Sequence, residues 1–278
     1  MNLKNIQSIE NVQSLLEKHN YIADRSLATS IYLSLVMDKP IFLEGEPGVG
    51  KTEVGKVLAK ILDTDLIRLQ CYEGLDVHNA IYEWNYSRQI LQIRMMEAEG
   101  QSSKDDISKE IFGSEFLIKR PLYQAIDHTG DNPPVLLIDE LDRADEEFEA
   151  YLLEILSEFQ ISIPEIGTIK AKEPPVVVIT SNRTREIHDA LKRRCLYHWI
   201  GYPSAVQEFE IIKRKIPDVQ DSLGKQVVAF VQAIRQQDFY KLPGIAETID
   251  WANALIKLGT TELSAEITSD TLGTLLKY

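Results

Sequence analysis

The sequence has few cysteines and no long apolar run. Its 278 residues include two cysteines, Cys71 and Cys195, which form neither a C-x-x-C motif nor a disulfide framework. A reducing, cytoplasmic compartment is therefore the expected location. No apolar run approaches the roughly 20 residues needed to span a bilayer. The N-terminus carries no apolar signal segment, so no membrane association is expected.

Basic residues are also in deficit. Lys and Arg number 30 against 43 Asp and Glu, which gives a formal net charge of −13. Broad nucleic-acid binding is disfavoured, because contacts to a phosphate backbone require clustered basic side chains. The content of 44% hydrophobic and 26% charged residues is ordinary for a globular protein. The length suits one large domain or two of unequal size.

One complete motif is present. Residues 45–52 read Gly-Glu-Pro-Gly-Val-Gly-Lys-Thr, between an apolar run at 41–43 and a helix-forming segment at 53–62. In such a G-x-x-x-x-G-K-T phosphate loop, glycines let backbone N–H groups surround an anion, and the next helix adds its positive end. Lys51 is expected to reach the β- and γ-phosphates, and Thr52 to ligate Mg²⁺. A glycine-rich turn with a chance lysine is the alternative, and the flanking strand and helix count against it. We predict nucleotide contacts at Gly45, Glu46, Pro47, Gly48, Val49, Gly50, Lys51, Thr52 and Glu53.

A second apolar run, at 135–138, ends in Asp139 and Glu140. Such a run is typical of a strand buried on both faces of a parallel sheet, where ligands collect at the carboxyl edge. Asp139 is expected to hold Mg²⁺, directly or through water, and Glu140 to polarise the attacking water. The alternative is that both acids cap a helix starting near Leu141.

Two further segments carry candidate polar groups. The run at 176–179 leads through Thr-Ser to Asn182, which either positions a water near the γ-phosphate or forms an Asx turn that ends the strand. Arg193 and Arg194 lie near the end of a short helical segment. They either offset the helix dipole or reach the γ-phosphate of a neighbouring subunit as an arginine finger.

The remaining pattern indicates an α/β core and a helical C-terminal part. Tyr202-Pro203 marks the expected boundary between domains 1–202 and 203–278, and a capping box at 204–207 opens the second. A small helical lid on an α/β core suits a nucleotide held in the crevice between them. We expect helices over 1–37, 146–159, 204–215, 219–237, 245–258 and 268–276, a second strand at 66–70, a hairpin of 161–163 with 168–170, and an exposed loop at 99–110.

Three aromatic residues, Tyr82, Trp84 and Tyr86, are spaced by two. In an extended segment their rings would share one face. They would then form either a grip on a substrate in a ring's central channel or, as we favour, a stripe packed in the core or at a subunit contact, because aromatic side chains bury large areas.

The order of these segments resembles that of AAA+ ATPases, over about residues 20 to 260, and more specifically the MoxR group that matures molybdenum-copper carbon monoxide dehydrogenase. The phrases that carry the second resemblance are CYEGLD at 71–76, YEWNY at 82–86, IDELDRAD at 138–145 and TSNRTRE at 180–186. The resemblance implies an αβα sandwich with a parallel sheet, followed by an all-helical lid. It also implies that the hairpin of 161–163 with 168–170, which precedes the run at 176–179, is a pre-sensor hairpin.

Family roles transfer to matching positions. The resemblance implies that Lys51 and Thr52 belong to Walker A, Asp139 and Glu140 to Walker B, Asn182 to sensor 1, and Arg193 or Arg194 to the arginine finger. Many MoxR proteins carry a Ser-Pro-Arg sensor 2 at the start of a lid helix, whereas residues 243–248 here contain no arginine. Another basic residue, in this chain or a neighbour, is expected to compensate.

The resemblance implies an ATP-driven remodelling chaperone that forms a ring, expected to be a hexamer. Its implied partners are a von Willebrand factor A-domain protein and a client metalloenzyme, such as a molybdenum hydroxylase or carbon monoxide dehydrogenase. Two other classes stay open: a non-hydrolysing nucleotide switch, against which Glu140 counts, and a DNA-remodelling motor, against which the acidic charge counts. A small-molecule P-loop kinase fits less well, because no arginine cluster forms a separate lid within the core.

Overall fold

A computed structural model describes residues 6–99 and 111–277. At its centre lies a five-stranded sheet with the strand order β2-β5-β8-β1-β9, and every pairing in it is parallel. The predicted parallel sheet is therefore confirmed, and β9 is a strand that the sequence analysis did not predict. The strands are β1 (Ile41–Gly45), β2 (Leu66–Gln70), β5 (Val135–Asp139), β8 (Val176–Ser181) and β9 (Leu196–Ile200).

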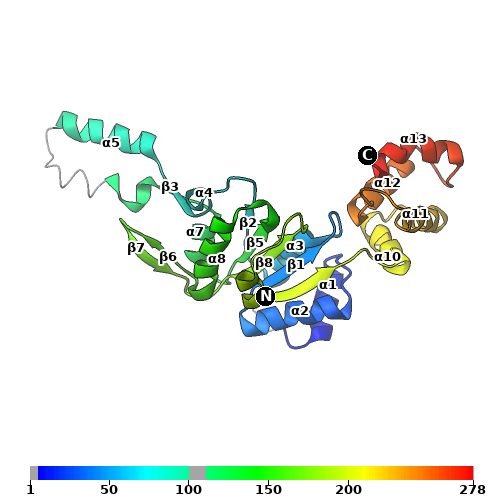
Figure 1. Cartoon of the computed structure of the whole chain (residues 1–278), viewed down its shortest axis with the longest axis horizontal. Helices are drawn as coiled ribbons and strands as arrows, with labels where there is room; N and C mark the ends of the chain where they lie inside the picture. Colours follow the sequence, from blue (N-terminus) through cyan, green and yellow to red (C-terminus); the bar gives the residue numbers. More distant parts are fainter. Residues whose placement is uncertain (1–5, 100–110, 278) are drawn as a thin grey trace.

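The continuous apolar runs are explained by burial on both faces of the sheet. Successive side chains of a strand point to opposite faces. Leu136 and Ile138 of β5 accordingly pack with Phe148, whereas Val135 and Leu137 pack in the cluster on the other face. Helices cover both faces (Figure 1). Those of the first face are α7 (Pro121–Ile126) and α8 (Glu146–Glu158), and those of the second are α1 (Ile9–Lys18), α2 (Arg25–Met37) and α3 (Lys51–Leu62).

The predicted N-terminal helical region is two helices separated by residues 19–24, and residues 1–5 lie outside the described part. The Asp24 carboxylate accepts a hydrogen bond of 2.7 Å from the Leu27 N–H and so caps α2. Helix α3 begins at Lys51, two residues earlier than expected, which places its N-terminus inside the phosphate loop.

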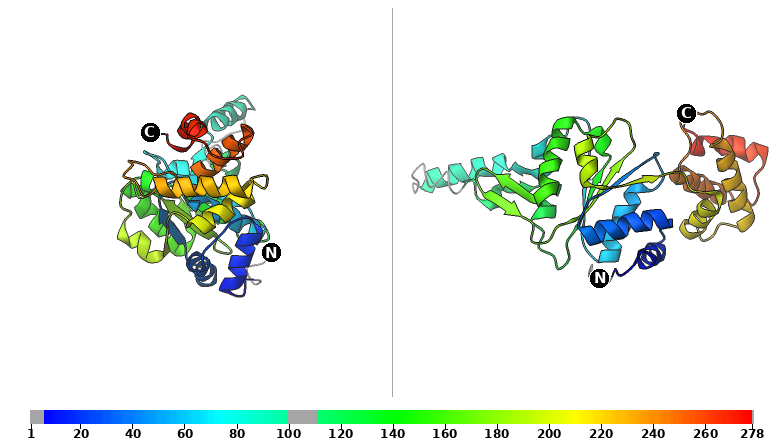
Figure 2. Two further views of the ribbon diagram at one scale, coloured as in Figure 1. Left: turned by 90° about the vertical axis from the view of Figure 1, so that its right-hand side faces the viewer. Right: turned by 60° about the horizontal axis from the view of Figure 1, so that its bottom comes forward.

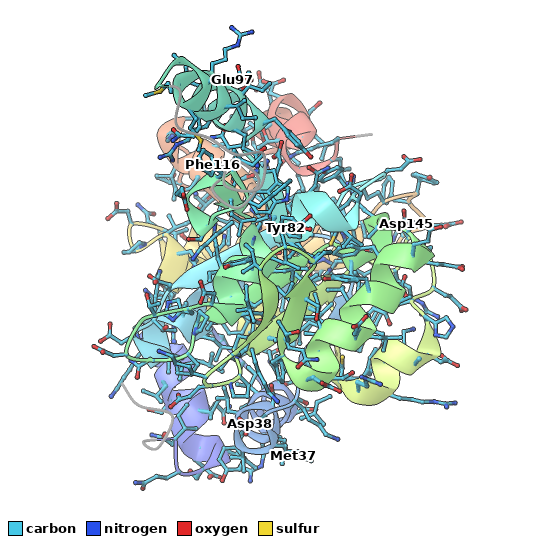
Figure 3. All side chains as sticks on the ribbon, turned by 90° about the vertical axis from the view of Figure 1, so that its left-hand side faces the viewer. Met37, Asp38, Tyr82, Glu97, Phe116 and Asp145 are labelled. Atoms are coloured by element: carbon cyan, nitrogen blue, oxygen red, sulfur yellow. The ribbon has the colours of Figure 1, made fainter. Side chains whose placement is uncertain are left out.

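An arm inserted after β2 projects from one end of the molecule (Figure 1). In Figure 3, Glu97 lies near the outer end of α5, at the opposite edge of the view from Met37. Strands β3 and β4 pair antiparallel at its base. Its elements are α4 (Val77–Ile81), β3 (Tyr82–Trp84), α5 (Tyr86–Glu99), the 3₁₀ turn Ser114–Phe116 and β4 (Leu117–Lys119). Apart from Glu99, the predicted loop at 99–110 lies outside the described residues.

The segment 82–86 is extended only as far as Trp84, so the three aromatic rings do not share one extended face. Trp84 is buried and packs edge-to-face on Phe112, with ring centroids 5.4 Å apart. Tyr86 starts α5 and is 65% exposed. The chain leaves the extended conformation at Asn85, whose side-chain oxygen accepts a hydrogen bond of 3.1 Å from the Arg88 N–H and so starts the helix. Burial of Trp84 favours a packing role over a grip.

The predicted hairpin is confirmed. Strands β6 (Gln160–Ile163) and β7 (Gly167–Lys170) pair antiparallel, and Gly167 adopts a φ of 99°, which favours glycine. The hairpin lies between α8 and β8 in the chain, on the same side of the molecule as the arm (Figure 1).

Residues 201–277 fold into four helices with a core of their own around Trp251 (Figure 2). Ser204 accepts a hydrogen bond from the Gln207 N–H and Gln207 accepts one from the Ser204 N–H, so the predicted capping box is confirmed. The first three helices run close to their predicted ranges, and the last begins three residues before its predicted range. These lid helices are α10 (Ala205–Lys215), α11 (Asp221–Ile234), α12 (Ile245–Lys257) and α13 (Ala265–Leu275).

Candidate functional site

A cleft of about 620 Å³ lies between the core and the lid. Its floor is the loop from Pro47 to Glu53, and its inner wall is formed by the carboxyl ends of β5 and β8. The connection between α1 and α2, the end of β9 and the lid helices α10 and α12 complete it. The cleft therefore lies where a phosphate loop, a sheet edge and a lid meet, as expected for a bound nucleotide.

The Lys51 ammonium is held by the backbone of its own loop. Its Nζ donates to the carbonyl oxygens of Gly45 and Glu46, each at 2.7 Å. Burial lowers the pKa of Lys51 to about 8, against the opposing effect of nearby acids, of which Asp142 is the strongest. The side chain is thus positioned at the N-terminus of α3 and weakly solvated, which suits it to bind an anion.

Asp139 is the centre of the polar network at the sheet edge. Its Oδ1 accepts hydrogen bonds from Thr52 at 2.9 Å and from Thr180 at 2.6 Å. Its Oδ2 accepts two from Arg68 of β2, at 3.1 Å from Nε and 2.5 Å from Nη2. Asp139 is 1% exposed, so this carboxylate is buried with partners on both oxygens. The Thr52 hydroxyl and the carboxylate supply adjacent hard oxygen donors, the kind that Mg²⁺ prefers.

Glu140 adopts a left-handed backbone conformation, with φ 56° and ψ 50°. This conformation is uncommon for a non-glycine residue and is often retained at functional sites. The Thr180 hydroxyl accepts the Glu140 N–H at 2.9 Å, and Arg143 Nε contacts the Glu140 Oε2 at 2.8 Å. Glu140 occupies the N-cap position of the 3₁₀ turn Leu141–Arg143, but its side chain makes no capping hydrogen bond, and the residue lines the cleft. A capping role for its carboxylate is therefore disfavoured.

Asn182 lines the same cleft, and its backbone is held by Asp142. The Asp142 carboxylate accepts hydrogen bonds from the Asn182 N–H at 3.1 Å and from the Thr184 N–H and hydroxyl at 2.9 and 2.6 Å. Burial alone would raise the pKa of Asp142, but these hydrogen bonds outweigh it and hold the pKa below its usual range. Asp142 therefore ties the segment after β8 to the turn that carries Glu140.

Arg193 and Arg194 end the short helix α9 (Asp189–Arg194), and neither lines the cleft. Both are exposed. Arg194 Nη1 donates to the Leu153 carbonyl of α8 at 2.8 Å. Upstream, Arg185 pairs with the buried Glu149 carboxylate. These contacts join the α9 segment to α8 and so to the region of Glu140.

The lid contributes one cation to the cleft. Lys215 of α10 contacts the Glu53 carboxylate at 3.4 Å, across the boundary between lid and core. Burial alone would raise the pKa of Glu53, but Lys215 and Lys56 outweigh it and lower the pKa below its usual value. The start of α12, which contains no arginine, places Ile245 and Ala246 at the cleft.

The structure brings most predicted site residues together and adds three that the sequence analysis missed. Lys51, Thr52, Asp139, Glu140 and Asn182 all line the cleft, as do the loop residues from Pro47 to Glu53. Gly45 and Glu46 contribute through their carbonyl oxygens. The missed residues are Arg68, Asp142 and Thr180. Each carried a weak signal: a charge inside a strand pattern, an acid three residues after Asp139, and a hydroxyl at a strand end.

A phosphate loop and two adjacent acids at the carboxyl edge of a parallel sheet, facing a helical lid, define an AAA+ P-loop nucleotide-binding fold. The profile of the AAA domain family, dynein-related subfamily, matches residues 40–195, which is more than half of the chain. The chain belongs to this family.

Solved structures show the same fold at low sequence identity. The RuvB Holliday junction branch migration motor of Thermotoga maritima is 17% identical, with a TM-score of 0.50 over 99% of this chain and 72% of that one. A single-residue variant of that motor has a TM-score of 0.51 at 17% identity, with the same coverage of both chains. No protein of curated function matches the sequence. Among residues 6–99 and 111–277, no helix has the length and apolar character to cross a bilayer.

Proposed function

We propose that this chain is an ATP-hydrolysing AAA+ protein. The observation that carries the proposal is the convergence of Lys51, Thr52, Asp139, Glu140 and Asn182 on one cleft between core and lid. These residues come from the start of one helix and the ends of two neighbouring strands. An accidental glycine-rich turn would not be accompanied by two acids and an amide at the same edge of the sheet.

Each group has a proposed role that its surroundings support. Lys51 and the loop N–H groups bind the phosphates, and Thr52 and Asp139 hold Mg²⁺, directly or through water. Bound Mg²⁺ would neutralise charge on the phosphate oxygens. Glu140 orients and polarises the attacking water, and Asn182 positions it.

The arginine finger is proposed to act in trans from α9. Arg193 is the better candidate, because Arg194 is already bonded to the carbonyl of Leu153. An arginine that serves a neighbour requires a ring, for which we propose six subunits. The absence of arginine from residues 243–248 is consistent with charge supplied from another subunit.

The cellular role is proposed from the MoxR resemblance. The chain would remodel or mature a client metalloenzyme, such as a molybdenum hydroxylase or carbon monoxide dehydrogenase, together with a von Willebrand factor A-domain protein. We propose a nucleotide-binding domain of residues 1–202 and a lid of 203–278. The cytoplasm is the proposed location, which suits two free cysteines.

The test separates binding from turnover. Glu140→Gln should retain ATP binding by calorimetry but lose roughly 10²- to 10⁴-fold in phosphate release, because the water loses its base. Lys51→Ala should weaken nucleotide binding by about 10- to 100-fold or more, because the phosphates lose their principal cation. Glu146→Gln, which alters an exposed acid in the first turn of α8, is the matched control and should leave both unchanged.

Three results would redirect the proposal. Absence of any heat with Mg²⁺ and adenine nucleotide would end it. ATP binding without turnover in the unaltered chain would indicate a switch. Salt-sensitive DNA binding that stimulates turnover would indicate a DNA motor.

Ring formation is checked by light scattering with and without ATP, where a monomer under both conditions contradicts the ring.

A further inference from the structure

The turn that opens α12 lies directly on the phosphate loop. The Ala246 N–H donates to the Gly48 carbonyl at 3.2 Å. A Cβ added to Gly244 would lie 2.7 Å from the Pro47 carbonyl oxygen and 2.9 Å from the Gly48 Cα. A Cβ added to Gly48 would lie 3.3 Å from the Gly244 Cα. The backbone of the turn therefore packs directly against the backbone of the phosphate loop, and only glycine at position 244 permits this approach.

Gly244 is not required by its own conformation. Its φ of −81° and ψ of −178° are open to any residue. Gly48, by contrast, has a φ of 76°, which favours glycine in any case. The informative glycine is thus Gly244, because its one evident constraint is the closeness of the phosphate loop.

The lid turn offers a carboxylate where a sensor arginine would offer a cation. Glu247 Oε2 accepts the Gly244 N–H at 3.0 Å, which caps α12 with an acid of its own. The same oxygen would lie 2.8 Å from a Cβ on Gly48. A direct ionic grip on phosphate by this turn is therefore disfavoured, and the contact that links the turn to the loop is the backbone contact with Gly48.

A buried ion pair holds the turn in the lid. Arg235 donates from Nε to the Pro243 carbonyl at 2.8 Å, and from Nη1 and Nη2 to the two carboxylate oxygens of Glu208 at 2.8 Å each. Its guanidinium stacks over the Tyr202 ring, 4.7 Å from the centroid. Thr248 of α12 also donates to Glu208, at 2.8 Å. The turn is thus fastened to α10, α11 and the connection from the core.

We propose that the contact of Gly244 and Ala246 with Gly48 is a backbone latch through which the lid responds to the phosphate loop, and that Arg235 and Glu208 are the positioning residues that hold the latch in place. The loop's carbonyl groups and its phosphate-binding N–H groups belong to the same peptide units. Reorientation of these units around phosphates therefore moves the acceptor of the Ala246 N–H. This inference rests on the proposed nucleotide binding at the loop.

Hydrogen exchange with mass spectrometry tests the latch. In the unaltered chain, peptides covering 244–250 should change protection between Mg²⁺-ADP and a Mg²⁺-bound non-hydrolysable ATP analogue. In Gly244→Ala, protection of these peptides should fall by about tenfold or more, because the Cβ displaces the turn and its hydrogen bond to Gly48. The response of the lid to nucleotide should then disappear, although calorimetry still detects binding. Gly273→Ala is the matched control, since a Cβ there meets open space, and it should keep the full response.

The outcomes separate this inference from the proposed function. If the unaltered chain binds no nucleotide, the proposed function fails. If it binds nucleotide and peptides 244–250 do not respond, the latch alone is overturned, and this result needs no variant. A retained response in folded Gly244→Ala also overturns it. If Gly244→Ala does not fold, Arg235→Lys takes its place and should reduce the response while nucleotide binding persists; a full response there overturns the positioning role.

Discussion

Two buried carboxylates, Asp139 in the core and Glu208 in the lid, each pair with an arginine, but the two arginines differ in their exposure to solvent. Asp139 is 1% exposed and Glu208 is fully buried. Each receives hydrogen bonds from a threonine hydroxyl and from an arginine. The arginine side chain on Asp139 is 47% exposed, whereas the one on Glu208 is 6% exposed.

The difference follows from what each carboxylate does. Glu208 joins three lid helices, so its cation is enclosed, bidentate and stacked on an aromatic ring. Asp139 is the proposed metal-site acid, and its present cation, Arg68, reaches in from the solvent-exposed part of β2. A cation with access to water can leave at low cost when another cation approaches. We therefore interpret the Glu208 pair as structural and the Asp139 pair as exchangeable.

The largest expected effect is on the lid pair. Arg235→Met should lower the free energy of unfolding by about 3–5 kcal/mol, because it leaves the Glu208 charge buried without a cation. Chemical denaturation followed by circular dichroism measures the change. The double variant Arg235→Met with Glu208→Leu should recover much of the loss, since neither charge is then buried.

An exposed ion pair in the same lid serves as the control. Lys213 and Asp221 contact each other at 2.8 Å, with side chains that are 41% and 62% exposed. Lys213→Met should leave the denaturation midpoint unchanged. A similar loss in both variants would contradict the structural role of burial at Arg235.

A smaller loss is expected at the core pair. Arg68→Met should cost about 1–3 kcal/mol, because Asp139 keeps two hydroxyl donors and the lost cation is partly screened by water. Mg²⁺ with ADP should stabilise this variant more than it stabilises the unaltered chain, because the metal no longer competes with Arg68 for the carboxylate. Denaturation with and without Mg²⁺-ADP measures both effects. Equal stabilisation of the two proteins would show that Arg68 does not compete.

The smallest expected effect is the pH dependence of nucleotide binding. Lys51 has a pKa of about 8, below its ordinary value of 10.5, because of burial. Affinity for ADP should fall by about tenfold between pH 7 and pH 9 as the ammonium loses its proton. Titration of a fluorescent ADP analogue measures this. Lys51→Arg, whose guanidinium stays charged, should show a flat profile; the same slope in both proteins would assign the effect to another group.

The lowered pKa of Lys51 has the opposite effect on the stability of the fold, which should rise with pH. Between pH 8 and 10.5 the unfolded chain holds the Lys51 proton more tightly than the folded one, so unfolding is favoured less as pH rises. The destabilisation from burying this ammonium is complete below about pH 8 and is relieved above it. Weaker nucleotide binding should therefore accompany a small gain in intrinsic stability.

Local patterns sufficed for much of the fold. The apolar runs before Asp139 and Asn182 became β5 and β8, and β2 has the predicted limits of Leu66–Gln70. The runs of β5 and β8 are easily recognised in the sequence because both strands are buried on both faces of the sheet, which leaves no polar residue within the run. The capping box of Ser204 and Gln207 could also be predicted from the sequence, because both residues lie within one helical turn.

The structure of two regions could not be predicted from local sequence patterns, and each has a physical reason. Strand β9 has half-buried and exposed residues in alternation, with Tyr197 and Trp199 exposed, so it lacks the continuous apolar run of the other strands. In the arm, Asn85 ends β3 and starts α5 within one residue. The spacing of two between Tyr82, Trp84 and Tyr86 therefore does not indicate a continuous strand, because it runs across the junction of a strand and a helix.

The sequence by itself determined the phosphate loop and the acids at the end of β5, because their chemistry depends on residues a few positions apart in one strand–loop–helix unit. Sheet order decided that Arg68 meets Asp139, since β2 pairs beside β5 with Gln70 opposite Asp139. Lid packing decided that Gly244 meets Gly48 and that Arg235 meets Glu208. Contacts between distant segments depend on the packing of whole layers, and no local pattern of side chains encodes them.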